Sequence, residues 1–419
     1  MASPKLRFKE FDRDWKVNTI QRFMDDNFIL DQMDGNHGEL YPKSEEFSSS
    51  GVPYLSATDF SSGAVDFSKC KRLPLERAKL FKKGIAKNGD VLFAHNATVG
   101  PVAILETELD FVILSTTATY YRCDGKRLNN RFLKNYFESE FFVQQYFGIM
   151  SQSTRNQVPI TTQRKLSISI PTIQEQTKIA SFLSSVDEKI SQLTKKYELL
   201  SQYKQGMMQK LFSQQIRFKA DDGSEFGEWE IKLIKDIADV KGGKRLPKGY
   251  SLINENTGHP YITVGDMNRS YSIDNANIRY VPLEVVDIIK RYTITDKEIF
   301  ISVAGTLGII GKIPTELNGA NLTENADKLT NLKCHQNFLI YLLDSGYLAE
   351  LIESTATTSA QPKLALYAIE QMEIQVPCLE EQTKIADFLS AIDQKIEVVA
   401  QQIEQAKQWK KGLLQQMFV

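Results

Sequence analysis

The feature that most constrains the fold is an internal repeat at an offset of 206 residues. The segment IPTIQEQTKIASFLSSVDEKI at 170–190 aligns without a gap with VPCLEEQTKIADFLSAIDQKI at 376–396, and the match continues through 213 and 419. Of the 44 aligned positions, 19 are identical. A repeat of this length defines the architecture. The chain therefore consists of a variable segment, a shared segment, a second variable segment and a second shared segment.

Each shared segment has the pattern of a long helix. Apolar residues recur in alternating steps of four and three, which predicts a coiled-coil seam. A helix covering one shared segment would be about 60 Å long. The predicted seam consists of Ile179, Leu183, Val186, Ile190, Leu193, Tyr197 and Leu200 in the first copy, and of Ile385, Leu389, Ile392, Ile396, Val399 and Ile403 in the second.

Both copies depart from the seam at the same place. Lys204 and Lys410 occupy seam positions, and they would either extend toward solvent, the preferred interpretation, or fix the register of the helices. Gly206 and Gly412 are costly in a helix interior, which indicates close approach of a partner helix or another subunit. At the start of the first helix, the segment from Thr172 to Glu175 predicts a capping box.

Neither helix can bury its apolar stripe alone. One alternative is that the stripe drives homodimerisation. Two matched copies within one chain favour the other alternative, an antiparallel intramolecular coiled coil, because this arrangement leaves room for one variable domain at each end.

The two variable segments are predicted to be α+β domains. Short apolar runs bounded by Gly, Asn and Pro predict strands at 91–94, 111–114, 299–302 and 309–310. Helices are expected at 130–147 and 335–354. The predicted fold is two α+β domains with a pseudo-twofold internal repeat, divided into a first domain at 1–170, a helix at 171–213, a second domain at 214–375 and a helix at 376–419.

Composition limits the possible functions. The 51 Lys and Arg residues balance 52 Asp and Glu residues, giving a formal net charge of −1. This balance excludes a uniformly basic nucleic-acid coat and a general attraction to anionic membranes. The N-terminal residues are charged and contain no apolar signal region, and the most apolar stretch, 299–313, is too short to span a bilayer. We expect a cytoplasmic protein.

Local basic clusters occur at the same stage of both variable segments. The first cluster, between residues 69 and 87, contains the candidates Lys69, Lys71, Arg72, Lys82 and Lys83; the second contains Lys241, Lys244 and Arg245. They are either solvated surface or contacts to DNA phosphates. The polar loop before each long helix is a second candidate region for base or backbone contacts, and it contributes Arg155, Asn156, Gln157, Gln361 and Lys363.

The sequence contains no complete motif for catalysis. It has no Asn/Asp-Pro-Pro-aromatic tetrapeptide for gripping a flipped adenine and no G-x-G-x-x-G turn. The segment 305–312 resembles a phosphate loop, but Thr306 replaces the first glycine and Ile313 replaces the Ser or Thr that would bind magnesium. The four His and four Cys residues lack the spacing of metal ligands. We expect no catalytic residue, metal or cofactor in this chain.

The motif P-x-x-x-E-Q-x-K-I-A-x-F-L, at 171–183 and again at 377–389, resembles the helical region of specificity subunits from Type I restriction–modification systems. The segments at 89–100 and 298–308 are similar to the G-D-[IV]-L and G-T-x-G pattern of the target-recognition domains in that family. The resemblance covers essentially the whole chain.

This resemblance implies a function. Each variable domain would be a target-recognition domain that reads one half of a split site in double-stranded DNA, and the helices would set the distance between the halves. Two methyltransferase (modification) subunits and two motor–nuclease (restriction) subunits would be the partners. S-adenosylmethionine, ATP and Mg would bind to those partners. The alternative function is a coiled-coil scaffold that assembles protein partners without reading DNA.

Overall fold

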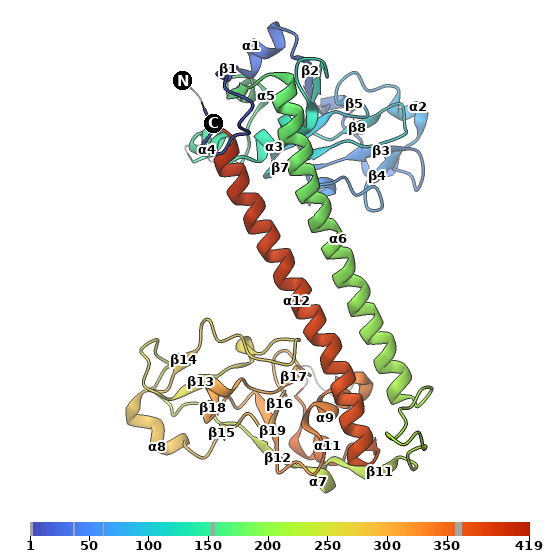
Figure 1. The fold of residues 1–419 in the computed structure, drawn as a ribbon, viewed down its shortest axis with the longest axis vertical. Helices are drawn as coiled ribbons and strands as arrows, with labels where there is room; N and C mark the ends of the chain where they lie inside the picture. The colour runs from blue at the N-terminus through green and yellow to red at the C-terminus, as the bar shows by residue number, and fades with distance from the viewer. Residues whose placement is uncertain (1–2, 37, 62, 152–155, 357–362) are drawn as a thin grey trace. The chain divides into compact units, whose positions relative to one another are not determined.

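The structure, a computed structural model, describes residues 3–36, 38–61, 63–151, 156–356 and 363–419. It contains two compact units. Unit 1 comprises residues 1–195 together with 400–419, and unit 2 comprises residues 196–399. The long helices α6 (Ile173–Phe212) and α12 (Leu379–Met417) each contribute residues to both units (Figure 1).

Unit 1 is built on two four-stranded sheets and a two-stranded ribbon. The strand orders are β2-β9-β6-β7 and β4-β3-β8-β5, and the ribbon pairs β1 with β10. The strands β3 and β8 pair in parallel. The strands are β1 (Lys16–Thr19), β2 (Ile29–Asp34), β3 (Val52–Leu55), β4 (Lys71–Leu73), β5 (Ile85–Ala86), β6 (Val91–Asn96), β7 (Thr98–Ile104), β8 (Val112–Leu114), β9 (Ala118–Cys123) and β10 (Ser167–Ile170). The short helices are α1 (Ile20–Asp25), α2 (Leu75–Ala78), α3 (Asn130–Glu138), α4 (Glu140–Met150) and α5 (Ile160–Gln163).

Unit 2 repeats this topology. Its strand orders are β12-β19-β16-β17 and β14-β13-β18-β15, with a ribbon of β11 and β20, and β13 pairs with β18 in parallel. The strands are β11 (Glu230–Leu233), β12 (Asp239–Gly242), β13 (Pro260–Ile262), β14 (Arg279–Tyr280), β15 (Thr293–Ile294), β16 (Ile299–Ser302), β17 (Ile310–Gly311), β18 (Ala320–Leu322), β19 (Ala326–Thr330) and β20 (Glu373–Val376). The short helices are α7 (Ile234–Ile237), α8 (Val286–Ile289), α9 (Gln336–Leu342), a π-helical segment (Leu343–Tyr347), α10 (Leu348–Ala356) and α11 (Leu366–Glu370).

The central strands are apolar on both faces because each separates two hydrophobic clusters. In β6, Val91 and Phe93 face one cluster, while Leu92 and Ala94 face another. Successive side chains of a strand point to opposite faces, so an uninterrupted apolar run is required here. In unit 2, β16 has the same arrangement, because Phe300 faces one hydrophobic cluster while Ile299 and Ile301 face another. The strands expected at 91–94 and 299–302 are therefore present.

The expected helix at 130–147 is interrupted. It is divided into α3 and α4 at Ser139, whose backbone is extended and whose hydroxyl donates a hydrogen bond of 2.6 Å to the Tyr136 carbonyl. The expected helix at 335–354 is likewise divided into α9 and α10 by the π-helical segment, in which Gly346 has a φ of 156°. Side-chain capping and one glycine thus break helices whose apolar pattern is continuous.

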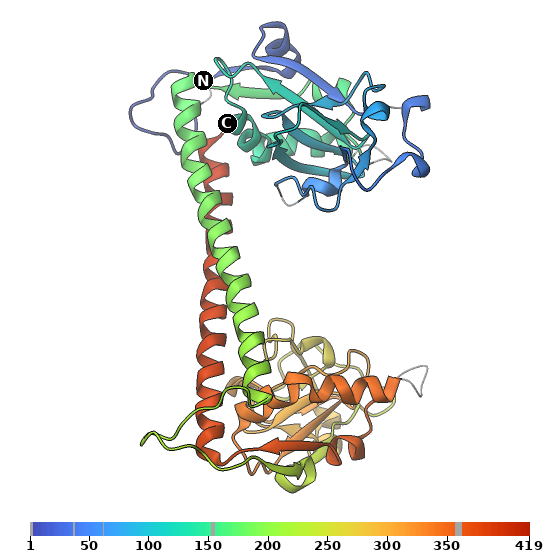
Figure 2. The same cartoon turned by 90° about the vertical axis from the view of Figure 1, so that its right-hand side faces the viewer.

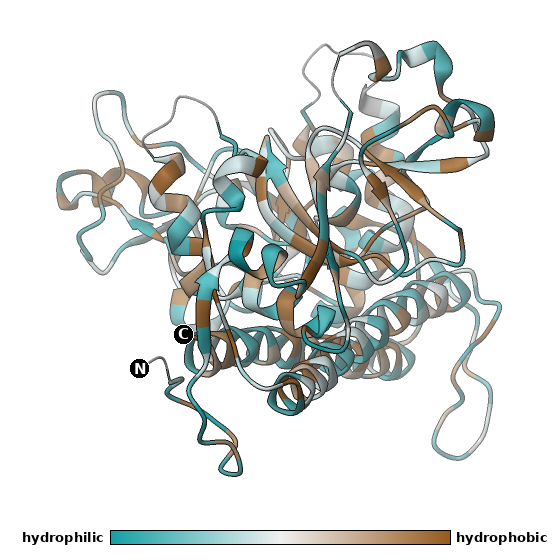
Figure 3. Cartoon of the chain, turned by 90° about the horizontal axis from the view of Figure 1, so that it is seen from above, coloured by the Kyte–Doolittle hydropathy of each residue, from teal (hydrophilic) through white to brown (hydrophobic). Residues whose placement is uncertain are grey.

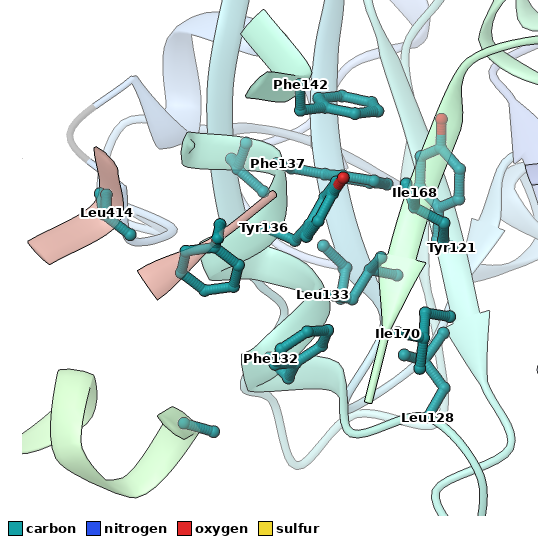
Figure 4. Packing of buried hydrophobic residues seen from close by; sticks show 14 of the residues in the cluster. Tyr121, Leu128, Phe132, Leu133, Tyr136, Phe137, Phe142, Ile168, Ile170 and Leu414 are labelled. Atoms are coloured by element: carbon teal, nitrogen blue, oxygen red, sulfur yellow. The ribbon is translucent and has the colours of Figure 1, made fainter. Parts of the chain in front are cut away.

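The core of unit 1 is completed by the C-terminal end of α12. Phe418 is 1 % exposed and packs against Trp15, Phe132 and Tyr136, with ring centroids 5.5–6.3 Å apart. The Tyr136 hydroxyl donates a hydrogen bond of 2.7 Å to the carbonyl of Val419. Figure 4 shows Leu414 of α12 beside the aromatic side chains of α3.

The core of unit 2 is completed in the same way by the end of α6. Phe212 packs against Phe338 at 5.9 Å, and Trp229 packs against the same ring at 6.1 Å. Figure 3 shows hydrophobic stretches along the strands, and hydrophilic and hydrophobic residues alternating along the long helices. The hydrophobic residues of each long helix therefore have two roles, because they contact both the other helix and a domain core.

In each unit, α6 and α12 lie side by side and run in opposite directions (Figures 1 and 2). In unit 1, Phe182 packs edge-to-face on Trp409 at 6.0 Å. The helices thus form an antiparallel intramolecular pair. Of the predicted seam residues, Ile179, Leu183, Val186, Leu193, Ile385, Leu389, Ile392 and Val399 are buried, Ile190, Leu200, Ile396 and Ile403 are half-buried, and Tyr197 is exposed.

The lysines in the seam do not extend to solvent, so the preferred interpretation of these residues is wrong. Lys410 lies 2.8 Å from Asp187 in unit 1, and Lys204 lies 2.6 Å from Asp393 in unit 2. The two pairs are related by the 206-residue offset. Burial alone would lower the pKa of Lys410, but Glu138 and Asp187 outweigh it and raise that pKa. An ammonium buried with its partner on the other helix favours one register.

The glycines of the two helices do not serve a helix–helix contact. Apart from the neighbouring backbone of its own helix, a Cβ atom added at Gly206 or Gly412 would meet no described atom within 4 Å. The expected close approach of a partner helix is therefore wrong for these two positions. Of the two interpretations offered for the glycines, approach by another subunit stays open.

The repeated Glu-Gln dipeptide ties each long helix to its unit. Glu175 is 1 % exposed and accepts hydrogen bonds from Arg7 at 2.7 and 2.8 Å and from the Trp15 indole at 3.3 Å. Its backbone N–H donates to the Thr172 hydroxyl at 3.4 Å, but its carboxylate is engaged by Arg7. Only that half of the predicted capping box forms.

The second copy reproduces these contacts. Glu381 is fully buried and accepts from Arg217 at 2.7 and 3.0 Å and from Trp229 at 3.1 Å. The neighbouring glutamine also has the same role in both copies. Gln382 accepts from the backbone of His335, and Gln176 accepts from the backbone of Asn129, each at 2.8 Å.

We predict that Glu381→Ala destabilises unit 2 by about 3–5 kcal/mol, because it leaves the Arg217 guanidinium and the Trp229 indole without their buried acceptor. The matched control is Asp221→Ala, which removes the exposed ion pair to Lys384 and should leave stability within experimental error. Urea unfolding of the full chain, followed by hydrogen exchange of β11 and β20, measures both. Equal midpoints for the two variants would contradict the prediction.

Candidate nucleic-acid interface

In unit 1, the loop that precedes α5 lies along the β6–β7 hairpin. The N–H of Ala97, at the hairpin tip with a φ of 63°, donates a hydrogen bond of 3.1 Å to the carbonyl of Asn156. The Asn156 side chain donates a hydrogen bond of 2.8 Å to the Ala97 carbonyl, and the Val158 N–H donates one of 2.8 Å to the backbone carbonyl of His95. These bonds fix the candidates Asn156, which is exposed, and Gln157, which is half-buried, beside the hairpin.

In unit 2, the corresponding loop is held in the same place. The Leu364 N–H donates a hydrogen bond of 3.0 Å to the Val303 carbonyl, and the Val303 N–H donates one of 2.8 Å to the backbone carbonyl of Asn325. The exposed candidate Lys363 directly precedes this contact. Gly305 and Gly308 form the adjacent turn with φ of 78° and 75°, values that favour glycine.

The basic loop after β12 lies at the same loop-bearing edge, which is the end of the sheet where β12 and β16 end and β19 begins. Gly242 pairs with Asp327 at the start of β19, and Ser302 at the end of β16 pairs with Ala326. Gly243 then donates to Ala326 at 3.0 Å, where a Cβ atom would lie only 2.0 Å from the Thr323 carbonyl. Only glycine fits this approach. Lys244, Arg245 and Lys363 are therefore carried by loops at one edge.

The cations at this edge are exposed. Lys241 lies 3.8 Å from Asp239, and the Arg245 Nε lies 3.0 Å from Glu324 with 75 % of the Arg245 side chain exposed. The Lys244 ammonium lies 5.7 Å from the centroid of the Tyr292 ring. Exposed ion pairs contribute little to stability, so these side chains can exchange their partners for phosphates.

The structure divides the larger basic cluster of unit 1. Lys69, Lys71 and Arg72 lie at or beside β4, whereas Lys82 and Lys83 precede β5, and these strands form opposite edges of one sheet. Arg72 donates to the carbonyls of Gly51 and Phe67 at 3.1 and 3.3 Å. The Lys71 ammonium lies 4.8 Å from the Phe47 ring. Arg72 thus holds its own domain together.

The second group lies closer to the candidate loops. The carbonyl of Lys83 accepts a hydrogen bond from the side chain of Asn36, which follows β2, and the carbonyl of Gly84 accepts a hydrogen bond of 2.7 Å from the Leu114 N–H. The side chains of Lys82 and Lys83 are exposed. The remaining candidates, Arg155 and Gln361, lie outside the described residues.

Sequence reasoning missed Asp327, at the start of β19. This residue is 6 % exposed, and burial raises the pKa of its carboxyl to about 6, although the charge of Lys363 acts in the opposite direction. Thr119 has the equivalent place in unit 1, with its hydroxyl 2.9 Å from His95 Nδ1. This exchange of a hydroxyl for a carboxyl becomes visible only when the strand registers of the two units are compared.

Within the described residues, no group of three or more His, Cys, Asp or Glu residues could hold a metal ion. None of the described helices is both long enough and apolar enough to cross a membrane.

A duplicated α+β domain with exposed cations on one loop-bearing edge, tied to paired long helices, defines a two-site recognition protein. The comparison with known families agrees. Residues 31–202 and 227–408 each match the family described as the Type I restriction modification DNA specificity domain. The chain belongs to this family, whose specificity subunits are the non-catalytic DNA-recognition components of Type I systems.

Curated relatives come from Methanocaldococcus jannaschii. The putative type I restriction enzyme MjaX specificity subunit is 29 % identical over 345 residues, which cover 78 % of this chain and 76 % of the relative. The MjaVIII specificity subunit is 27 % identical over 261 residues, which cover 59 % of this chain and 60 % of the relative.

Solved structures share the fold. The S subunit of a Type I restriction–modification system from M. genitalium matches with a TM-score of 0.60 and 18 % identity, covering 100 % of this chain and 99 % of that one. A chain from a study of complex assembly and conformational transition in the type I system matches with a TM-score of 0.56 and 16 % identity, covering 96 % and 97 %.

We predict that Asp327→Asn removes a pH-dependent loss of stability. The carboxyl has a pKa of about 6 in the folded chain and about 3.9 when unfolded. The folded state therefore binds more protons between these values, and stability falls as pH rises from about 4 to about 6. At pH 8 the variant should be more stable than the wild type by up to about 3 kcal/mol, whereas at pH 4 the difference should vanish.

The measurement is urea unfolding of the full chain at both pH values, with hydrogen exchange of β19 as the readout for unit 2. Asp239→Asn, on the neighbouring strand with an exposed carboxyl, is the matched control. A stability difference between Asp327→Asn and wild type that is the same at pH 4 and pH 8 would exclude a titrating carboxyl.

Proposed function

We propose that this chain is the specificity subunit that selects a bipartite DNA site for a Type I restriction–modification complex. Residues 1–170 and 214–375 are the two reading domains, and the segments 171–213 and 376–419 set the distance between the half-sites. The observation that carries the proposal is the duplicated family match together with an equivalent loop-bearing edge in each unit. The scaffold alternative is not favoured, because the matched family is defined by DNA specificity.

The reading step uses two kinds of contact. Exposed lysine and arginine side chains hold phosphates and set the position of the duplex, and polar side chains of the loops read base edges in the major groove. The near-zero net charge gives little general attraction, so we propose that tight binding needs the partner subunits. A protein that selects sites on chromosomal and incoming DNA acts in the cytoplasm, and we propose that compartment.

The partners are proposed to be two methyltransferase subunits and two motor–nuclease subunits. S-adenosylmethionine, ATP and Mg belong to those subunits. Two features of the helices support docking of two like partners. Tyr203 and Trp409, which are related by the 206-residue offset, are 51 % and 54 % exposed. Each lies three residues before a glycine, Gly206 or Gly412, that has open space around its Cα atom.

The function is tested by methylome sequencing of cells that express this chain with its methyltransferase subunit. We expect a methylated adenine motif in two parts separated by a constant gap. Replacing Lys244, Arg245 and Lys363 together by Ala should weaken binding of the complex to that motif and lower the slope of log affinity against log salt by about 1 for each phosphate contact.

The matched control for this variant is Lys219→Ala, which removes an exposed lysine paired with Glu225. It should leave both affinity and salt slope unchanged. A continuous methylated motif would refute bipartite reading, and an unchanged salt slope in the triple variant would refute the phosphate contacts.

The docking surface gives a separate prediction about stoichiometry. Trp409→Ala should reduce a complex of two methyltransferases per chain to one, because it removes one of the two exposed aromatic anchors. Tyr203→Ala should do the same at the other anchor, and the double variant should bind neither subunit. Mass photometry of the reconstituted complex counts the subunits, and Leu199→Ala, which removes an exposed leucine of α6, is the control. Two bound methyltransferases on the double variant would rule out this surface.

A further inference from the structure

Unit 1 has a cavity of about 370 Å³ between α3, α6 and the loop before Phe67. Its lining includes Gly63, Lys134, Asn135, Ser184 and Asp187. Asn135 is only 2 % exposed, and its Oδ1 atom accepts no hydrogen bond from any residue in the described part of the chain. A buried acceptor without a donor is unfavourable, and Asn135 is one of the residues that line the cavity.

The internal repeat shows what the same place contains in unit 2. Tyr341 has the place of Asn135, at the 206-residue offset. Its hydroxyl donates a hydrogen bond of 2.7 Å to Asp393, which corresponds to Asp187, and lies 3.2 Å from Ser390, which corresponds to Ser184. In unit 2, the Tyr341 phenol therefore donates a hydrogen bond to the carboxylate of Asp393, which also forms the ion pair with Lys204.

A second tyrosine of unit 2 is also replaced in unit 1. Tyr271 has a φ of 61° and lies three residues before Asp274; Gly63 has a φ of 87° and lies three residues before Asp66. Asp274 and Asp66 donate equivalent backbone bonds of 2.7 Å to Asp266 and Asp59. The two loops are thus counterparts.

In unit 2, the two tyrosine rings enclose the buried ammonium. The Nζ atom of Lys204 lies 4.3 Å from the Tyr271 ring centroid and 5.0 Å from the Tyr341 centroid, and the rings meet edge-to-face at 5.3 Å. Such contacts stabilise a cation. In unit 1, the corresponding Lys410 pairs with Asp187 and Glu138, and a glycine and an asparagine stand in place of both rings.

We propose that the cavity of unit 1 receives a phenol, the side chain of a tyrosine presented by the methyltransferase subunit that docks on this unit. The hydroxyl donates to Asn135 Oδ1 or to Asp187, as Tyr341 donates to Asp393, and the ring lies toward the Lys410 ammonium. The choice of a protein tyrosine rests on the proposed function; the choice of a phenol rests on the comparison of the two units. Lys410, which pairs with the cavity residue Asp187, directly follows the exposed Trp409 of the proposed docking surface in the chain.

The first test uses 4-methylphenol, the tyrosine side chain alone, with the full-length protein and ligand-observed NMR. We expect a dissociation constant in the millimolar range and binding of toluene at least fivefold weaker, because toluene lacks the donor. Asn135→Tyr should weaken 4-methylphenol binding at least tenfold and should not lower the melting temperature. Asn135→Leu should remove the preference for 4-methylphenol over toluene. Equal binding of the two ligands to the wild type, or unchanged 4-methylphenol binding to Asn135→Tyr, would overturn the phenol site.

The second test measures the affinity of the methyltransferase subunit for the wild type and for Asn135→Tyr. We expect at least a tenfold loss at one of the two docking sites. If 4-methylphenol binds as expected and this affinity is unchanged, the occupant is not a partner tyrosine. If the methyltransferase subunit does not bind the wild type at all, the proposed function fails, and the 4-methylphenol result still decides whether the cavity takes a phenol.

Discussion

The burial of hydrophobic residues from the ends of the long helices is the constraint on which both units depend. Phe418 fills the core of unit 1 beside Trp15 and Phe132, and Phe212 has the equivalent place beside Phe338 in unit 2. Neither core is complete without a helix end that is distant from most of it in the sequence. Hydrophobic burial of this kind is the dominant favourable term in folding. Each core therefore contains residues of both long helices, and the packing of the cores also holds the helices together.

Polar groups then specify how the helices pair. An apolar heptad seam can slip by one repeat with little change in buried area, whereas a buried lysine needs its own aspartate on the other helix. Lys410 with Asp187 and Lys204 with Asp393 supply this requirement once in each unit. The buried glutamates Glu175 and Glu381 add a second constraint, because each accepts hydrogen bonds from an arginine and a tryptophan near the start of the domain that its helix follows.

The sequence predicted the parts of this fold that depend on periodicity. The 206-residue repeat, the long helices and the uninterrupted apolar strands follow from residue spacing alone. The partners of the buried charges could not be predicted from the sequence. Heptad spacing places Lys204 in a seam, but it does not say which residue faces Lys204. The basic cluster at 69–87 misled for a related reason. Residues that are close in the sequence lie at opposite edges of one sheet, because β3 and β8 lie between β4 and β5.

The two units differ in the buried polar groups beside the loop-bearing edge. In unit 1, Gln163 accepts hydrogen bonds from Tyr121 at 2.5 Å and from Gln32 at 3.2 Å, and donates one to Thr119 at 3.1 Å. The corresponding residues of unit 2 are apolar, namely Ile369, Leu329 and Val240, each less than 9 % exposed.

This difference explains the environment of Asp327. It has the place of Thr119, but Ile369 replaces the amide that serves Thr119. Burial raises the pKa of the Asp327 carboxyl, and the apolar Ile369 offers it no hydrogen-bond donor. The helix contacts, by contrast, are the same in kind in both units, from the Arg–Glu–Trp contacts to the Lys–Asp pairs. Divergence at the loop-bearing edges with retention of the helix contacts fits the proposed function, in which the chain reads two different half-sites and binds two like partners.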